Sequence, residues 1–422
     1  MTERLHNWAG NLTYGAARVE YPTTVAEVQR LVAGTARVKA LGSRHSFSDV
    51  ADTTGTLVSL RNLNRVVAVD REQRTVTIEG GITYGELGPV LDAAGWALPN
   101  LASLPHIAVA GACATGTHGS GDRNGGLATS ASALEVVIAD GSLVQFSREQ
   151  DGDRFDGVVV ALGALGVVVR LTLDLVPAFA VRQNVYEELP LAELEARLDA
   201  ITGSAYSVSL FTDWQGPVIQ QVWLKQRVSD DAPDEAPPAF YGATPATREL
   251  HPIGRLPADS CTAQRGVPGP WHTRLPHFRP DHTPSSGDEL QSEYFVPRAY
   301  AGGAFRAVLA LREALAPILQ ISEIRTVAGD TLWLSPCEGR DSVALHFTWS
   351  SDRTRVERVL PRLEEALQPF AARPHWGKVF TLAPGSLRAL YPRLPDFRRL
   401  SADYDPSGKF RNGFLERYVT GI

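Results

Sequence analysis

The stretch Leu41-Gly42-Ser43-Arg44-His45-Ser46-Phe47-Ser48 decides the fold of this chain. It follows an apolar run at residues 36–40, which we expect to form a strand, and a helical pattern at residues 25–32. A strand followed by glycine and small hydroxyl side chains presents backbone N–H groups to an anion. Taken alone, the loop favours a simpler interpretation, a glycine turn with an exposed histidine. Other stretches of the chain must therefore decide between the two.

Two glycine-rich stretches change the balance, because together with this loop they are long enough to line a dinucleotide. One begins at Ala102-Ser103-Leu104-Pro105-His106 and continues through residues 111–121, and the other is Gly163-Ala164-Leu165-Gly166-Val167-Val168. Glycine lets a backbone approach a ligand closely, and the hydroxyls of Thr115 and Thr117 can donate to phosphate. Residues 98–121 lack regular periodicity but contain apolar side chains, which favours a functional loop over disorder.

The length of the chain predicts two domains. Its 422 residues exceed one comfortable hydrophobic core. Hydrophobic residues make up 44% and charged residues 21%, as in soluble globular proteins. With Pro177 at the boundary, we expect a first domain at residues 1–176, a second domain at 177–371, and a return to the first domain at 372–422.

Charge and cysteine content exclude several classes of protein. The formal net charge of −6 argues against nucleic-acid binding, which needs a basic face. Cys113, Cys261 and Cys337 lie far apart without metal-site spacing, so no metal is expected, and so few cysteines suit a reducing cytoplasm. The sequence has no apolar leader and no run of transmembrane length. We therefore expect a soluble, cytoplasmic monomer without nucleic-acid or membrane partners.

Strands and helices interleave in the first domain without a regular repeat. Strands are expected at residues 57–60, 66–69, 75–79 and 167–175, and Asp140-Gly141 is expected to turn a hairpin between 134–139 and 143–146. Thr83 and Glu86 predict a capping box for a helix that ends at Gly95, and residues 153–162 predict another helix. No G-x-G-x-x-G opens a helix after the first strand, so the domain is predicted to be α+β rather than a Rossmann fold.

Alternating strands dominate the second domain, which predicts an antiparallel sheet with helices on one face. An acidic, proline-rich excursion is expected at residues 230–238, and residues 254–287 are proline-dense and irregular. The expected strands are residues 181–187, 207–211, 218–225, 290–295, 320–326, 331–334 and 343–349, and the expected helices are residues 304–314 and 356–367.

Three of these strands carry one polar and one apolar face, because side chains at i and i+2 point the same way. An ordinary amphipathic sheet with a solvated face is the simpler interpretation. Here, however, the polar face lacks lysine and mixes acid, guanidinium, imidazole and hydroxyl groups. That mixture suits a ligand with many hydroxyls, each of which needs a donor and an acceptor. The pairs that share a face are Glu323 with Arg325, His346 with Thr348, and Gln291 with Glu293.

These motifs together make the chain similar to flavoprotein oxidases of the vanillyl-alcohol-oxidase type. Within that group it resembles the alditol oxidases, relatives of the aldonolactone oxidases, from Asn7-Trp8-Ala9-Gly10-Asn11 to Asp405-Pro406-Ser407-Gly408-Lys409-Phe410. The resemblance implies an α+β, two-domain fold. It implies a PCMH-type FAD-binding domain of two α+β subdomains at residues 1–176, to which residues 372–422 return, and a substrate domain built on an antiparallel sheet covered by helices.

The resemblance also implies covalently bound FAD. In this family the histidine of G-S-x-H-S is joined to the 8α carbon of the flavin, a role that falls here to His45. Arg44 stands where a glycine is common, which implies a tighter loop, and Ala108 stands where relatives carry a serine, which implies one flavin hydrogen bond fewer. The residues expected to contact the cofactor are Leu41, Gly42, Ser43, Arg44, His45, Ser46, Phe47, Ser103, Ala108, Gly111, Thr115, Gly116, Thr117, His118, Val168 and His375.

The reaction implied by the resemblance is oxidation of the terminal primary hydroxyl of an alditol, such as xylitol or sorbitol, to the aldose. Oxygen would be reduced to hydrogen peroxide. Arg325 and Lys378 are expected to stabilise alkoxide character, Glu323 to hold the neighbouring hydroxyl, and His346 to accept the proton. The expected substrate contacts are Ser103, Glu323, Arg325, Thr348 and Lys378.

Two other functions compete with this one. An aldonolactone oxidase or dehydrogenase would share the fold and the covalent histidine. A sugar-binding protein without redox chemistry would use the same polar face. The expected cytoplasmic location, with no apolar leader in the sequence, argues against such a protein. The sequence does not rank the alditols against one another.

Overall fold

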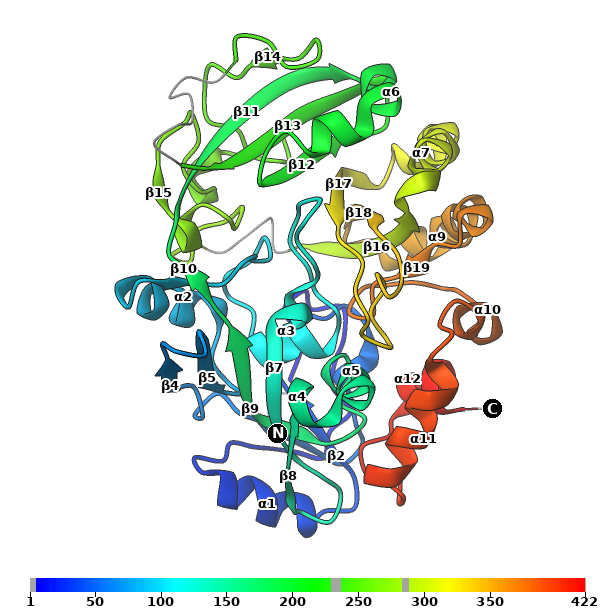
Figure 1. Cartoon of the computed structure of the whole chain (residues 1–422). Helices are drawn as coiled ribbons and strands as arrows, with labels where there is room; N and C mark the ends of the chain where they lie inside the picture. The colour runs from blue at the N-terminus through cyan, green and yellow to red at the C-terminus, as the bar shows by residue number, and fades with distance from the viewer. Residues whose placement is uncertain (1–4, 229–236, 283–287, 422) are drawn as a thin grey trace.

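The computed structural model describes residues 5–228, 237–282 and 288–421 (Figure 1). Most of the expected acidic, proline-rich excursion at 230–238, and the end of the irregular stretch at 254–287, lie outside the described residues. In Figure 1 the N-terminal half of the chain forms the lower part of the molecule, and the strands from β11 onward form the upper part.

The loop that carries His45 leaves a small parallel sheet at the N-terminus. Strands β1 (Arg18–Glu20), β3 (Thr56–Ser59) and β2 (Val38–Leu41) lie in that order, and helix α1 (Val25–Ala33) packs beside them. The helix and strand that were expected here are confirmed, with Thr24 capping α1 by accepting from Glu27 N. Because Leu41 is the last residue of β2, the strand delivers the loop directly to the cavity described below.

A five-stranded antiparallel sheet follows, in the order β4-β5-β9-β7-β8. It confirms the predicted hairpin, where Gly141 adopts φ of +88°, and the predicted capping box of α2, in which Thr83 and Glu86 bond reciprocally. The elements are β4 (Val66–Asp70), β5 (Thr75–Glu79), α2 (Tyr84–Ala93), α3 (Val109–Ala114), β7 (Ala131–Val137), β8 (Leu143–Ser147), α4 (Arg148–Asp151), α5 (Asp153–Val159) and β9 (Val167–Asp174).

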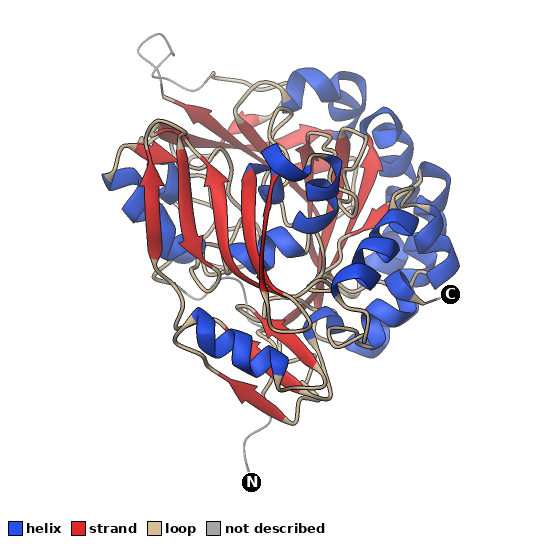
Figure 2. Ribbon diagram, turned by 60° about the horizontal axis from the view of Figure 1, so that its bottom comes forward, coloured by secondary structure: helices blue, strands red, loops and turns tan. Residues whose placement is uncertain are grey.

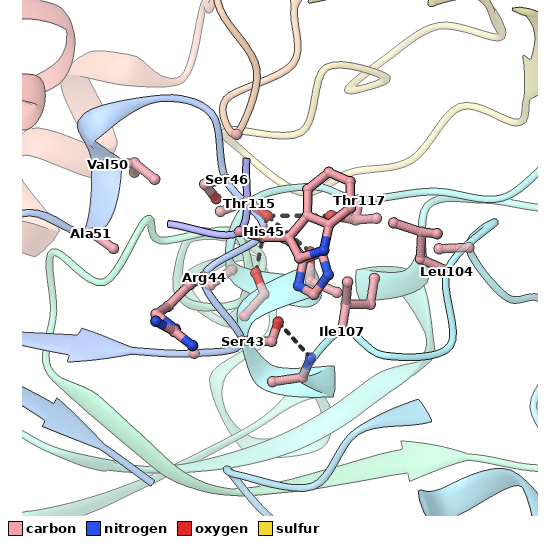
Figure 3. A pocket seen from close by; sticks show the side chains of 18 of the residues that line it. Ser43, Arg44, His45, Ser46, Val50, Ala51, Leu104, Ile107, Thr115 and Thr117 are labelled. Carbon is pink, nitrogen blue, oxygen red and sulfur yellow. Dashed lines mark hydrogen bonds between the residues drawn. The ribbon is translucent and has the colours of Figure 1, made fainter. Parts of the chain in front are cut away.

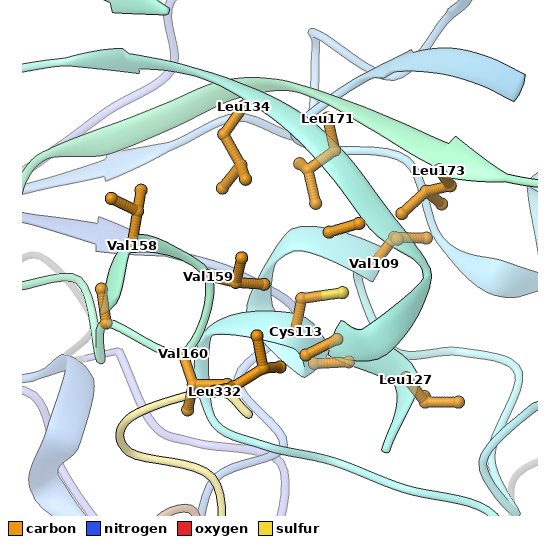
Figure 4. Close-up of a cluster of buried hydrophobic side chains, with 14 of the residues drawn as sticks. Val109, Cys113, Leu127, Leu134, Val158, Val159, Val160, Leu171, Leu173 and Leu332 are labelled. Atoms are coloured by element: carbon orange, nitrogen blue, oxygen red, sulfur yellow. The ribbon is translucent and has the colours of Figure 1, made fainter. Parts of the chain in front are cut away.

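Helix α3 was not expected, because its small residues leave no helical periodicity in the sequence. It packs Val109 and Cys113 under the sheet, next to Leu134, Leu171 and Leu173 (Figure 4). Burial of this side, rather than capping, stabilises the helix: Ala108 at its N-cap makes no side-chain hydrogen bond.

A nine-stranded sheet forms the upper part of the molecule, in the order β14-β11-β13-β12-β17-β18-β16-β19, with β15 paired to β11. Its strands are antiparallel, as predicted. They are β11 (Ala180–Pro190), β12 (Ser207–Thr212), β13 (Val218–Arg227), β14 (Thr244–Pro245), β15 (Gly269–Pro270), β16 (Glu289–Pro297), β17 (Leu319–Val327), β18 (Ser342–Ser350) and β19 (Arg373–Pro374).

Helices cover one face of this sheet (Figures 1 and 2). Their apolar side chains form one buried cluster with Ile324, Leu345 and Phe347 from the centre of the sheet. The helix expected at 304–314 is divided in two, and α6 was not expected. The covering helices are α6 (Leu191–Thr202), α7 (Ala301–Ala310), α8 (Arg312–Leu315) and α9 (Arg353–Leu367).

The strand predicted at residues 331–334 is wrong. These residues form a loop in which Trp333 N donates to Asp156 O at 3.1 Å. Leu332, Trp333 and Leu334 are buried in the core of the N-terminal half. These residues are apolar because they pack against the N-terminal half of the molecule, and not because they form one face of a strand.

The C-terminal segment returns to the N-terminal half through α10 (Pro384–Ala389), α11 (Leu394–Tyr404) and α12 (Gly413–Leu415), whose Leu387, Phe397 and Phe414 join that core. A short ladder between β6 (Trp96–Ala97) and β10 (Val176–Pro177) ends the N-terminal half. The exact domain boundaries, 176/177 and 371/372, stay a proposal. Across the described ranges, no helix combines the length and the apolar character needed to cross a membrane.

Candidate active site

One cavity of about 380 Å³ runs between the glycine-rich loops and the polar face of the nine-stranded sheet. The structure brings the predicted cofactor and substrate residues together in its lining, with Gly116 as the exception. Gly116 adopts φ of +69°, and a Cβ there would lie 3.0 Å from Pro336 Cδ. Its glycine therefore serves the turn that follows α3 and the close approach of Pro336, outside the cavity wall.

The His45 loop is held in shape by the N-terminal segment. Arg44 adopts φ of +64°, a left-handed conformation that costs a non-glycine residue free energy. Trp8 N donates to Arg44 O at 2.8 Å, and Asn7 Nδ2 donates to Ser46 O at 3.0 Å. The Arg44 side chain points away from His45, toward the backbone of His6 (Figure 3). These bonds keep Arg44 in a conformation for which glycine would otherwise be favoured.

His45 is partly buried, with one ring nitrogen unpartnered. Its Nδ1 is inaccessible to solvent and has no hydrogen-bond partner in the described part of the chain, and its ring stacks on Trp8 with 5.6 Å between centroids. Burial, followed by the positive charges of His106 and Lys378, lowers the pKa of His45 to about 4. At neutral pH the ring is uncharged, so one nitrogen offers a free lone pair.

The second wall of the cofactor end is built on the start of α3. Ser43 Oγ accepts from Ala108 N at 3.1 Å (Figure 3), which joins the His45 loop to this helix. A Cβ on Gly42 would come within 3.8 Å of Ala108 Cβ and 3.9 Å of Gly111 Cα. The two loops thus approach closely, and Thr115 and Thr117, bonded to each other at 3.3 Å, face the same space.

Side chains from three neighbouring strands form the polar wall. In the pairing register, His346 of β18 lies opposite Glu293 of β16 on one side and Glu323 of β17 on the other. Thr348 lies opposite Gln291 one step along the strands. Directly opposite residues share one face of a sheet, so the predicted polar faces meet in one surface that lines the cavity.

Arg325 is a fixed cation in this wall. Its Nη2 donates to Glu293 Oε1 at 2.7 Å, and its Nε lies 3.5 Å from Glu323 Oε1. Its Nη1 donates to Ser103 Oγ at 3.4 Å, on the loop that precedes α3. Burial would lower the pKa of Arg325, but the two carboxylates raise it above its usual range. The guanidinium therefore stays charged and oriented.

Glu293 is a site residue to which the sequence assigned no role. Its Oε1 accepts from both Arg325 and, at 3.0 Å, His118 Nε2, so it joins the sheet to the loop after α3. Burial alone would raise the pKa of Glu293, but His118 and Arg325 hold it well below its usual range. The signal that could have found it is its shared strand face with Gln291.

Glu323 has a partner that the sequence did not indicate. His277 Nε2 lies 2.8 Å from Glu323 Oε1, and the backbone N–H groups of His277 and Phe278 donate to Ser103 O. Lys225 Nζ fixes this segment by donating to the carbonyls of Arg274, Leu275 and Pro276. His277 comes from the irregular, proline-dense stretch, where no periodicity points to a role.

His346, Gln291 and Lys378 meet at one point of the wall. Gln291 Oε1 lies 3.1 Å from His346 Nε2 and also accepts from Lys378 Nζ. Burial, followed by the charge of Lys378, lowers the pKa of His346 to about 3, so the imidazole is neutral. Burial also lowers the pKa of Lys378. His375, two residues from Gly377, accepts from Gly377 N at 3.0 Å through Nδ1 and shapes the loop that presents Lys378.

Comparison with known proteins identifies the family. The FAD binding domain family matches residues 16–147, and the D-arabinono-1,4-lactone oxidase family matches residues 288–418. An alditol oxidase from a Streptomyces species is 53% identical over 424 residues, covering 100% of both chains. The chain belongs to the alditol oxidase family. This makes it an FAD-dependent oxidoreductase and excludes the interpretation as a sugar-binding protein without redox chemistry.

More distant relatives carry names that describe activity on lactones. An L-gulono-1,4-lactone dehydrogenase from Mycobacterium tuberculosis is 30% identical over 435 residues, covering 98% of each chain. Among solved structures, glucooligosaccharide oxidase from Acremonium strictum superimposes with a TM-score of 0.72 at 17% identity, covering 98% of this chain and 94% of that one. The latter similarity shows a shared fold and confirms the predicted class of mixed helices and antiparallel sheets.

The residues present fit FAD. The buried, unpartnered Nδ1 of His45 and the close approach of Gly42 to Gly111 leave a long space lined by backbone and small hydroxyls. Such a lining suits a dinucleotide. Among the described residues, no group of three histidine, cysteine, aspartate or glutamate side chains is placed to hold a metal ion.

Proposed function

We propose that this chain oxidises the terminal primary hydroxyl of alditols such as xylitol and sorbitol to the aldose, with oxygen reduced to hydrogen peroxide. One observation carries the proposal. A neutral imidazole, a fixed guanidinium and an ammonium group, from His346, Arg325 and Lys378, line the same cavity as His45. That combination removes a hydroxyl proton and stabilises the resulting negative charge.

The covalent link to FAD is part of the proposal. His45 is a neutral histidine in the cofactor end of the cavity, with a ring nitrogen free of other partners. The glucooligosaccharide oxidase structure carries, by its title, a 6-S-cysteinyl, 8α-N1-histidyl FAD. Here Cys113, Cys261 and Cys337 are buried and do not line the cavity, so we propose a single link through His45. Bound FAD supplies the acceptor for the hydride.

The chain's own residues would then bind and prepare the alcohol. Arg325 and Lys378 lower the energy of alkoxide character at the reacting oxygen, because fixed charges in a dry site need no reorganisation. Glu323, charged and held by His277, accepts from the neighbouring hydroxyl. Ser103 and Thr348 supply hydroxyls that donate or accept along the chain of the substrate. His346 takes the hydroxyl proton.

Discrimination would come from the polar wall itself. A site built to bond hydroxyls rejects an alcohol that lacks them, because its own buried groups are left unpaired. Glu293, Glu323 and Arg325 are each at most 6% exposed, so water does not replace a missing partner freely. A simple primary alcohol without a neighbouring hydroxyl should therefore be a poor substrate.

Aldonolactone oxidation is the second candidate, favoured by the match of residues 288–418 to the D-arabinono-1,4-lactone oxidase family. Hydrogen peroxide production measured with xylitol, sorbitol and L-gulono-1,4-lactone at equal concentration separates the two. Turnover of the alditols above the lactone supports the proposal, and turnover of the lactone alone replaces it. A cytoplasmic location and a monomeric state remain proposals that follow from composition.

A further inference from the structure

Gln291 connects the groups that would handle the substrate proton. Its Oε1 accepts from Lys378 Nζ and lies 3.1 Å from His346 Nε2, while its Nε2 donates to Glu289 Oε1. An ammonium group has only donors, and a carboxylate oxygen accepts. Both neighbours therefore require the same orientation of the amide, with its oxygen toward Lys378 and His346 and its NH₂ toward Glu289.

This orientation dictates the tautomer of His346. An amide oxygen only accepts, so Nε2 of His346 must carry the proton. The ring is neutral because burial, and next the charge of Lys378, lower its pKa to about 3. A neutral imidazole holds one proton, which leaves Nδ1 with a bare lone pair. Among the described residues, the ring is hydrogen-bonded through Nε2 only, and the side chain lines the cavity.

We propose that Gln291 is a positioning residue that holds His346 in the Nε2–H tautomer, so that Nδ1 is the atom that takes the proton of the reacting hydroxyl. The role of Nδ1 rests on the proposed function, whereas the tautomer does not. In the step, the O–H bond breaks and its proton goes to Nδ1. The electron pair left on oxygen would form the C=O bond as the adjacent C–H bond breaks, and FAD, when bound, would supply the acceptor for the hydride.

The charges around His346 fit a group that becomes positive only during the reaction. Lys378 and Arg325 disfavour the imidazolium, while Glu293 and Glu323, directly opposite on the two neighbouring strands, favour it. The two carboxylates partly offset the effect of the two cations, so the positive charge that forms when Nδ1 takes a proton is partly neutralised. In the resting ring, desolvation dominates and keeps the imidazole neutral.

The test is the ¹⁵N spectrum of [¹⁵N]histidine-labelled holoenzyme without substrate, with His346 assigned by its absence in His346→Gln. We expect the shift of a bare nitrogen for Nδ1 and of a protonated nitrogen for Nε2. Gln291→Leu removes the acceptor and should mix the tautomers and lower kcat for xylitol by at least about tenfold. Gln291→Glu combined with Glu289→Gln exchanges the two groups, keeps an acceptor for both Lys378 and His346 and leaves the charge unchanged, so it should restore the tautomer and most of kcat.

A protonated Nδ1 in the wild type would overturn the proposal, as would Gln291→Leu with unchanged tautomer and unchanged kcat. If Gln291→Leu does not fold, the wild-type spectrum and the exchange of Gln291→Glu with Glu289→Gln still decide. A wild type that turns over no alditol but shows the Nε2–H tautomer would refute the proposed function and leave the role of Gln291 intact. The two failures are therefore distinguishable.

Discussion

His45 and His346 line the same cavity, and both are neutral, yet their surroundings differ. His45 stacks on Trp8, and the charges that act on its pKa, from His106, Lys378 and Arg44, are all positive. His346 lies between two carboxylates and donates to an amide oxygen. Burial thus makes both rings uncharged, and the neighbours decide the rest. A ring with no carboxylate among the groups that act on its pKa suits a permanent bond to carbon, and a ring flanked by acids suits transient proton uptake.

The largest effect is expected from His45→Ala, which removes the proposed attachment point. In the wild type, acid-precipitated protein should keep its yellow colour, and in the variant all flavin should pass to the supernatant. The acid-soluble flavin is measured by absorbance. His282→Ala is the matched control, since His282 is a partly exposed histidine outside the cavity lining that pairs with Asp281. A colourless wild-type pellet would show that His45 carries no covalently bound flavin.

Replacing the second histidine should preserve the flavin and slow the chemistry. His346→Gln is expected to lower kcat for xylitol by about 10² or more, the usual contribution of a positioned base. Acid-stable flavin should remain at the wild-type level. His272→Gln, at a half-buried histidine away from the cavity, provides the control. Equal turnover in His346→Gln and wild type would show that another group takes the proton.

A smaller loss is expected for Arg325→Ala. Losing a charge-assisted hydrogen bond at a buried site costs about 1.5–3 kcal/mol. Since ~1.4 kcal/mol is a factor of ten, kcat/KM for xylitol or sorbitol should fall at least tenfold. Flavin content should not change. Arg325→Lys keeps the charge without the fork that spans Glu293 and Ser103, and should recover only part of the loss. Arg279→Ala, on the surface, controls for expression and folding.

No effect is expected from thiol alkylation under native conditions. Cys113, Cys261 and Cys337 are buried, and burial raises the pKa of the first two thiols to about 12 and that of the third above its usual range. Thiolates, the reactive form, are therefore scarce. Peroxide production measured before and after iodoacetamide should agree within error. Stoichiometric inactivation on labelling one cysteine would place a thiol near the chemistry.

The sequence predicted what short-range rules determine. The capping box of Thr83 and Glu86, the Asp140-Gly141 turn and the polar faces of β16, β17 and β18 all depend on residues a few positions apart. Helix α6 was missed although Leu191, Leu194, Leu198 and Ile201 repeat at helical spacing. This spacing is a local pattern that predicts the helix.

Other features depend on contacts between distant segments. The row of Glu293, His346 and Glu323 requires the register of three strands, and i,i+2 patterns do not give it. His277 reaches Glu323 from an irregular segment that Lys225 holds in place. The strand expected at 331–334 was wrong because its apolar residues dock against the other half of the molecule. Tertiary packing, not local pattern, places these residues.

Alditol oxidation by bound flavin can be followed in the visible spectrum of purified enzyme during anaerobic mixing with xylitol or sorbitol, followed by admission of air. We expect a yellow protein that bleaches with the alditol, regains its colour in air and releases one equivalent of hydrogen peroxide for each aldose formed. A yellow protein that no alditol bleaches, but that L-gulono-1,4-lactone does, would contradict it.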